Sequence, residues 1–474
     1  MMACRFRIAL LALGILLAGP HGRVVAFPVD GDQTTLPPKT ELNEDVLDKP
    51  REVFRSELDG GKSYMVNLGN LAFSSPGILG GVARQAAISC GTCHVNGAGN
   101  AKFFMPKMST RPGNFDTTSS LFNHKADNGV LDPVRVPSLR GERFLAPYGN
   151  DGRIASLRDF VRNVIVNEFS GPEPSPTILD ALVAYIEDID FLKNQSLDSN
   201  GRLTGQSNEA ERRGETIFSR PFPRDASMSC AICHIPSAGF VDHKQHEVGS
   251  GGLFKTPTLR NADFNAPYFH DGRYGRLDQV VDHFDRVFEL GLTPQDRSDL
   301  TAYLKAVGDG VVPYDLDGVT GRMKEINDFA SVLDFAIPAH DSAVVELAVS
   351  TIGQELRDLT EKFPDRRDPT VTGGLKERLA ARAALKDVVI RFRHIGIAAA
   401  AGRFDEADAE YKDYRQLTAF ALPTLLATAQ PWSLFNLPVY KAHYAAMWQR
   451  LRQTQKSMQV SAAPANAATE STAK

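Results

Sequence analysis

Two short motifs contain four of the five cysteines in the 474-residue chain. They are SCGTCHV at residues 89–95 and SCAICHIPSAGF at residues 229–240, and each contains Cys-x-x-Cys-His. This pattern is typical of c-type haem attachment, in which two thiols add to the haem vinyl groups and the adjoining histidine binds the iron. The motifs predict two covalently bound haem c groups. The predicted attachment residues and proximal iron ligands are Cys90, Cys93, Cys230, Cys233, His94 and His234.

Two other kinds of site could use the same cysteines. The four thiols could bind one structural zinc ion, but both histidines would then be unexplained. The two pairs could instead be redox-active dithiols, which need no histidine and usually belong to a βαβ unit that this sequence lacks. The haem interpretation accounts for all four cysteines and both histidines, so it is preferred.

The first 26 residues have the layout of a secretory signal peptide. Arg5 and Arg7 precede the apolar run IALLALGILLAG at 8–19, and VVA at 24–26 offers a small-residue cleavage site. A membrane anchor is the alternative, but the run is shorter than the roughly 20 apolar residues that span a bilayer. We therefore expect a soluble periplasmic protein with no membrane span. The formal net charge of −4 gives no reason to expect binding to nucleic acid.

A longer repeat follows each cysteine motif. Residues 137–161 (PSLRGERFLAPYGNDGRIASLRDFV) and 257–281 (PTLRNADFNAPYFHDGRYGRLDQVV) are identical at twelve of 25 positions, at a constant offset of 120. Because each copy lies behind its own Cys-x-x-Cys-His, the simplest interpretation is a pair of homologous domains, each with its own haem.

Helical patterns surround the motifs and continue to the end of the chain. Amphipathic helices are expected at 157–165 and 277–284, and closing helices at 177–192 and 293–308, the last of them capped by Thr293. From about 320 onwards, apolar residues recur at spacings of three and four. The predicted fold is therefore mainly α, with two cytochrome c-like haem domains in tandem followed by a C-terminal helical bundle.

These patterns divide the chain into six segments. The predicted segments are a signal peptide (1–26), an extended N-terminal arm (27–59), cytochrome c domain 1 (60–200), cytochrome c domain 2 (201–312), a helical domain (313–458) and a disordered tail (459–474).

Because of the two Cys-x-x-Cys-His motifs and the repeat behind each, the region from about 60 to 310 resembles the bacterial di-haem cytochrome c peroxidases and their MauG-like relatives. The most specific stretches are KTPTLRNADFNAPYFHDGRYGRLDQVVDHF at 255–284 and APYGNDGRIASL at 146–157. The resemblance implies an exported oxidoreductase in which one haem transfers electrons and the other meets hydrogen peroxide. In MauG-like members the second role is oxidation of a protein substrate. The implied partner is a small electron-donor protein, a c-type cytochrome or a cupredoxin, and a homodimer is left open.

The first repeat departs from the family pattern near the expected peroxide site. The tryptophan that the family places between its haems is Asn150 here, so Tyr148 or Tyr268 would have to substitute for it. The family's distal glutamine corresponds to Phe160, whereas its distal glutamate is matched by Glu168 at a shorter spacing. A carboxylate above an open iron could move a proton between the peroxide oxygens. The alternative is that Glu168 is a solvated helix residue.

The sixth iron ligands and the calcium site of the family are also altered. The family's methionine or tyrosine ligand in the second domain is Phe284, and its neighbour His283 could bind iron only if the helix were rotated; otherwise it contacts solvent or a propionate. In the first domain Met108, or Met105, could be a sixth ligand or could cover the haem edge. Arg135 stands at the family's calcium-binding asparagine, and a cation there argues against calcium.

Three functions remain on these grounds. The preferred one is reduction of hydrogen peroxide by a di-haem oxidoreductase. The second is MauG-like oxidation of a partner protein, with the helical region as the docking surface. The third is pure electron transfer, in which both irons have six ligands.

Overall fold

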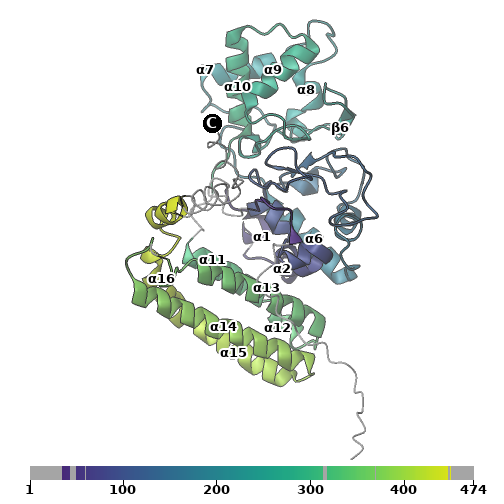
Figure 1. Ribbon diagram of the computed structural model, residues 1–474. Helices are drawn as coiled ribbons and strands as arrows, with labels where there is room; N and C mark the ends of the chain where they lie inside the picture. Colours follow the sequence, from purple (N-terminus) through teal and green to yellow (C-terminus); the bar gives the residue numbers. More distant parts are fainter. Residues whose placement is uncertain are drawn as a thin grey trace, which may run out of the picture.

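The computed structural model describes residues 35–42, 50–58, 60–312, 318–368, 370–446 and 449. Within them the chain is mainly helical, as predicted, and its strands are two-residue segments in three antiparallel pairs (Figure 1). The predicted signal peptide and tail, and much of the predicted arm, lie outside the described residues. A search of the described helices for a segment long and apolar enough to cross a bilayer finds none.

A close helix crossing organises the unit that carries the first cysteine motif. Helix α2 (Tyr64–Phe73) packs against α6 (Pro176–Asp188). At the crossing point, a Cβ atom on Gly69 would lie 1.9 Å from the carbonyl oxygen of Ala181. Only glycine therefore permits this approach of the two backbones. The predicted closing helix ends at Asp188, because the next residues turn extended and form a strand.

The second unit repeats this arrangement. Helix α7 (Glu209–Ser219) packs against α10 (Pro294–Gly308), and a Cβ atom on Gly214 would lie 2.1 Å from the carbonyl oxygen of Asp299. The hydroxyl of Thr293 accepts a hydrogen bond from the Asp296 N–H, so the predicted cap of α10 is confirmed.

Shorter elements complete the two units. In the first they are β1 (Val53–Phe54), α1 (Arg55–Leu58), η2 (Pro76–Ile78), α3 (Gly81–Gln85), α4 (Cys90–Cys93), η3 (Val95–Gly97), β2 (Asn114–Phe115), β3 (Val134–Arg135), η4 (Glu142–Phe144), α5 (Leu157–Asn163), η5 (Val164–Glu168) and β4 (Ile189–Asp190). In the second they are α8 (Cys230–Cys233), η6 (Pro236–Ala238), β5 (Gln245–His246), β6 (Phe254–Lys255), η7 (Ala262–Phe264) and α9 (Leu277–Phe288). The strand pairs are β1 with β4, β2 with β3 and β5 with β6.

The helices after residue 318 pack on the first unit. They are α11 (Val319–Ala330), α12 (Leu333–Ala336), α13 (Ser342–Glu361), α14 (Leu375–Ala400), α15 (Phe404–Ala419), α16 (Ala421–Ala429) and η8 (Gln430–Trp432). Their buried core includes Leu68, Leu71 and Ala181, which belong to α2 and α6. Figure 1 shows the order of the parts: α7–α10 at one end, α2 and α6 in the middle, and α13–α15 at the other end.

Direct hydrogen bonds join the two repeated units. The Lys255 ammonium group in the second unit donates to the carbonyl oxygens of Leu145 and Pro147 in the first, at 2.7 Å each. In the opposite direction, Arg135 donates from Nη1 to the carbonyl oxygen of Asn265, at 3.2 Å. The two cysteine motifs are thus held on either side of a polar junction.

Candidate haem and peroxide site

The first cysteine motif opens onto a cavity in the first unit. The single turn α4 places Cys90 and Cys93 on the cavity wall, and His94 follows directly. The turn is fixed at its start, because the Ser89 N–H donates to the Thr92 hydroxyl at 3.1 Å. Most of the remaining wall is apolar. An apolar cavity with two thiols and an imidazole on its wall fits a covalently attached haem.

His94 is prepared as a neutral nitrogen ligand. Its Nδ1 donates to the carbonyl oxygen of Pro137 at 3.0 Å, which leaves Nε2 as the lone-pair donor. Burial lowers the pKa of His94 to about 4, so the imidazole is uncharged at neutral pH. The Phe73 ring of α2 lies 6.1 Å from the imidazole, centre to centre. A fixed tautomer and a neutral ring are what an iron ligand requires.

The second motif has the same design. The His234 Nδ1 donates to the carbonyl oxygen of Phe240 at 3.1 Å, and burial lowers the pKa of His234. The Phe218 ring of α7 lies 6.4 Å from this imidazole. Burial also raises the pKa of the Cys230 thiol to about 12, as it does that of Cys90. These thiols are therefore held in the protonated form in the haem-free chain.

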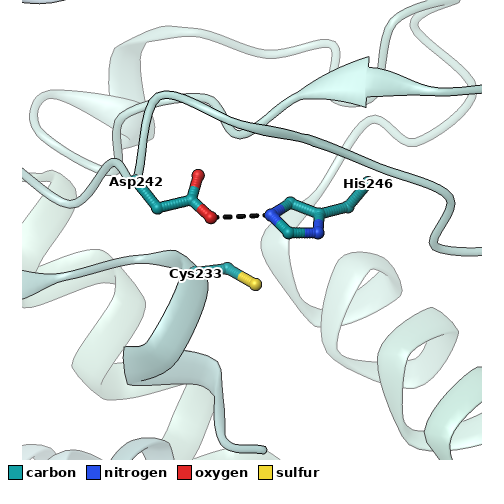
Figure 2. A group of neighbouring side chains, drawn as sticks. All are labelled: Cys233, Asp242 and His246. Carbon is teal, nitrogen blue, oxygen red and sulfur yellow. Dashed lines mark hydrogen bonds and ion pairs between the residues drawn. The ribbon is translucent and has the colours of Figure 1, made fainter.

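Only one cluster of three metal-ligating side chains occurs among the described residues, and it contains a single cysteine. Ligand atoms of Cys233, Asp242 and His246 lie within 4.8 Å of one another (Figure 2). The His246 Nε2 and an Asp242 carboxylate oxygen are 2.6 Å apart. The four motif cysteines thus do not come together, which removes the alternative of one Cys4 zinc site. When Cys233 carries haem, the Asp242–His246 pair lies beside that haem.

Glu168 lies on the wall of the first cavity. It is only 7% exposed, which is inconsistent with a solvated helix residue. Its Oε1 accepts hydrogen bonds from Arg153 Nη2 at 3.0 Å and from Asn163 Nδ2 at 3.1 Å. Glu168 ends η5, a π-helical turn that continues α5, and such turns are frequent at functional sites. The helix expected at 157–165 thus ends in a widened turn, and Glu168 is the last residue of that turn.

The junction between the units supplies further polar groups to this cavity. Lys255 reaches the wall from the second unit, and Glu142 lies on the wall in the first. Burial raises the pKa of Glu142 to about 7, and the nearby Lys255 charge opposes this rise. Asn150 is also on the wall; its Nδ2 donates to the Arg135 carbonyl oxygen, and its own carbonyl accepts from the Lys255 N–H.

The two tyrosines considered as substitutes for the missing tryptophan differ in position. Tyr148 lines the first cavity, and its hydroxyl donates to the Glu142 carbonyl oxygen at 3.3 Å. Tyr268 makes the equivalent bond in its own repeat, to the Ala262 carbonyl oxygen at 3.1 Å, and is not among the cavity-lining residues. Of the two tyrosines, only Tyr148 therefore lies at the first cavity.

The sulfur ligand expected in the first unit is not brought to the cavity. Met108 is 4% exposed and Met105 is fully buried, and both belong to the apolar core of this unit. Neither methionine is among the residues that line the cavity. Their placement supports the alternative role of apolar cover.

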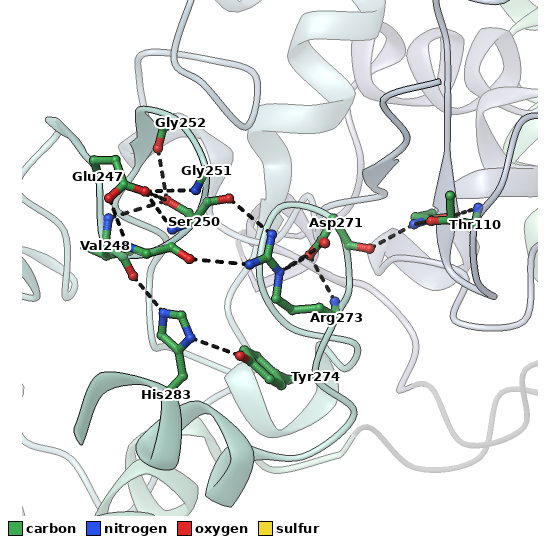
Figure 3. A network of polar contacts seen from close by, with 12 residues as sticks. Thr110, Glu247, Val248, Ser250, Gly251, Gly252, Asp271, Arg273, Tyr274 and His283 are labelled. Carbon is green, nitrogen blue, oxygen red and sulfur yellow. Dashed lines mark hydrogen bonds and ion pairs between the residues drawn. The ribbon is translucent and has the colours of Figure 1, made fainter. Parts of the chain in front are cut away.

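The structure gives His283 a role other than iron ligation. Its Nε2 donates to the Val248 carbonyl oxygen at 2.7 Å, and its Nδ1 accepts from the Tyr274 hydroxyl at 2.9 Å (Figure 3). Both ring nitrogens are thus engaged, because α9 turns residue 283 toward the loop at 247–252. In this arrangement His283 braces the loop and offers no nitrogen to iron.

At the position expected for a calcium ligand, the structure shows a buried cation. The Arg135 guanidinium contacts the Asn265 carbonyl oxygen, and burial lowers the pKa of Arg135 to about 10. The Asn265 carbonyl oxygen therefore accepts a hydrogen bond from a guanidinium group, and the absence of calcium stays a prediction.

Sequence reasoning gave no role to three groups at this cavity. Arg153 is identical to Arg273 in the second repeat, and this identity could have marked it as a candidate site residue. Glu142 and Lys255 carry no such signal, because they come together only when the two units dock.

Two Cys-x-x-Cys-His turns, each with a buried neutral histidine, define a di-haem c-type protein. The comparisons agree: residues 211–308 match the family described as di-haem cytochrome c peroxidase. This match confirms the resemblance and the oxidoreductase class predicted from the sequence.

Three curated relatives extend the match. The chain is similar to hydrazine synthase subunit gamma of Kuenenia stuttgartiensis, with 24% identity over 325 residues, 56% of this chain and 83% of that protein. It is similar to cytochrome c551 peroxidase of Nitrosomonas europaea, with 21% identity over 296 residues, 51% and 79% of the two chains. It is also similar to methylamine utilization protein MauG of Methylorubrum extorquens, with 28% identity over 126 residues, 20% and 34% of the two chains.

Proposed function

We propose that this chain is a periplasmic di-haem c-type oxidoreductase that reduces hydrogen peroxide at its first motif. One observation carries the proposal: Glu168 lies on the same cavity wall as Cys90, Cys93 and His94. Among the described lining residues of that cavity, His94 is the only histidine and there is no methionine. Among the histidines and methionines of the lining, only His94 could bind the iron of a haem held here. The Glu168 carboxylate would lie in the same cavity as an acid–base group.

The chain's own residues have separate tasks in this reaction. A bound haem would supply a redox-active iron with an open position for peroxide. Both hydrogen bonds to Glu168 go to Oε1, so Oε2 is available to take a proton from peroxide and return it to the departing oxygen. Reduction of one peroxide to two waters consumes two protons and two electrons. The electrons would come from the second haem and, before it, from a small c-type cytochrome or cupredoxin.

The domain organisation belongs to the same proposal. The two units with crossed helices and cysteine turns would be the two cytochrome c-like domains, at 60–200 and 201–312. The helices after 318 would form the C-terminal bundle, and residues 1–26 would direct export. The repeated geometry at Gly69 and Gly214 supports this division.

Glu168→Gln tests the peroxide role directly. The variant keeps the size and hydrogen-bonding capacity of the side chain but loses its ability to carry a proton at neutral pH. We expect peroxide turnover with a reduced small cytochrome to fall by about 10²–10⁴-fold. The matched control is Glu173→Gln, which alters a nearby exposed glutamate that pairs with Arg162 on the surface. Equal turnover in both variants would remove Glu168 from the mechanism.

A second candidate function is oxidation of a partner protein, which the resemblance to MauG-like proteins implies. Several large apolar side chains of the C-terminal region are exposed, among them Phe420 by 80% and Trp432 by 42%. They could contact such a partner. Slow peroxide turnover, combined with peroxide-dependent oxidation of a bound protein, would favour this function. A pure electron carrier would show no high-spin ferric iron at rest.

A further inference from the structure

Arg153 and Arg273 occupy equivalent positions in the two repeats. Each ends an Asp-Gly-Arg triplet, at the constant offset of 120. Arg273 pairs with Asp271 at 2.9 Å and donates to the carbonyl oxygen of Ser250 at 3.1 Å (Figure 3). Its guanidinium therefore holds the loop at 247–252 against the second repeat.

Arg153 also pairs with the aspartate of its own triplet, but its second partner is the Glu168 carboxylate rather than a loop carbonyl oxygen. Its Nη1 donates to Asp151 at 3.0 Å, and its Nη2 donates to Glu168 Oε1 at 3.0 Å. The position equivalent to Glu168 in the second repeat is Phe288, which cannot accept a hydrogen bond. The carboxylate contact is thus particular to the first repeat.

Arg153 also belongs to the cavity itself. It is among the lining residues, and its guanidinium carbon lies 5.5 Å from the centre of the Phe160 ring. Phe160 cannot hydrogen bond to a ligand, so the polar groups of this part of the wall are Arg153 and Glu168. Asn163, which does not line the cavity, donates to Glu168. The side chain of Arg153 is 44% exposed, so its charge lies between the cavity and solvent.

We propose that Arg153 is the positioning residue of the peroxide site. By donating to Oε1 it holds the Glu168 carboxylate in one orientation and keeps Oε2 for proton transfer. Its single positive charge partly offsets the two neighbouring carboxylates, those of Asp151 and Glu168, and so lowers the repulsion that an anion meets in the cavity. This inference rests on the proposed function, because it requires an open iron at the first motif.

Fluoride binding to the ferric di-haem protein tests the proposal without turnover. Fluoride is a small anion whose binding to an open iron changes the absorption spectrum. We expect Arg153→Gln to weaken fluoride binding by about fivefold, a modest factor because solvent screens a half-exposed charge. Arg153→Lys keeps the charge and should recover most of the affinity. Arg273→Gln is the matched control and should bind fluoride as the unaltered protein does.

The outcomes separate this inference from the proposed function. Equal fluoride affinity in Arg153→Gln and the unaltered protein would overturn the role of Arg153 while leaving the open first iron in place. Failure of the unaltered protein to bind fluoride at all would overturn the open iron, and with it both proposals. The haem spectrum and melting temperature of Arg153→Lys should equal those of the unaltered protein, which shows that the substitution leaves the fold intact.

Discussion

The two haem units share their attachment turn but differ in what surrounds it. Both place a histidine with its Nδ1 on a carbonyl oxygen, behind a helix crossing at glycine. In the first unit a buried carboxylate, Glu168, faces the cavity, whereas Phe288 occupies its equivalent position in the second and stacks with Phe284. The two units thus share the arrangement that is proposed to hold haem and differ at a few positions beside it.

The hydrogen-bonding partners of equivalent residues show the same divergence. Asn163 donates to Glu168 in the first unit, while its counterpart, His283, spans Val248 and Tyr274 in the second. One side chain supports a reactive group and the other supports a loop. Under the proposed function, polar contacts rather than cysteines distinguish the first unit as the reactive one.

The largest effect is expected from removing the attachment cysteines of one unit at a time. Replacing Cys90 and Cys93 by alanine should abolish peroxide turnover and lower the protein mass by one haem. Replacing Cys230 and Cys233 should remove the other haem and also stop turnover, yet preserve fluoride binding at the first. Mass spectrometry and fluoride titration measure both results. Loss of both haems from either pair of substitutions would show that the units do not mature independently.

The next effect concerns the two glycine crossings. Gly69→Ala and Gly214→Ala each introduce a Cβ about 2 Å from a backbone carbonyl oxygen, so the helices must move apart. We expect each change to lower the free energy of unfolding by about 1–3 kcal/mol, as overpacking does. Gly205→Ala, where a Cβ would meet open space, is the control. Chemical denaturation checks this prediction, and unchanged stability at both crossings would contradict the close packing.

The smallest effect is a pH dependence that arises at Glu142 in the first unit. Burial raises the pKa of Glu142 to about 7, so the folded chain binds a proton more tightly there than the unfolded chain does. Stability should therefore decline as pH rises from about 4.5 to 7, by about 1–2 kcal/mol for a half-buried group. Glu142→Gln should flatten this decline, as seen in melting temperatures across that range. Parallel curves for the two proteins would refute the prediction.

Much of the chemistry could be predicted from residue types and spacing, because covalent haem attachment needs cysteine and histidine at fixed intervals. The cap at Thr293 and the mainly helical fold followed from local patterns, whereas Glu168 was singled out only by the family resemblance. The expected iron ligands Met108 and His283 did not, because spacing along a helix cannot reveal which loop packs against it. The contact of Lys255 with Leu145 and Pro147 depends on the docking of distant segments, which no local pattern records.

The C-terminal helices have a consequence for how the two units can be separated. Leu68, Leu71 and Ala181 of the first unit are buried among those helices, whereas the apolar core of the second unit contains only residues between 197 and 307. A shortened chain ending at residue 312 would leave the back of the first unit exposed to water. The main apolar core of the second unit is thus independent of the helices after residue 318, whereas the first unit shares a core with them.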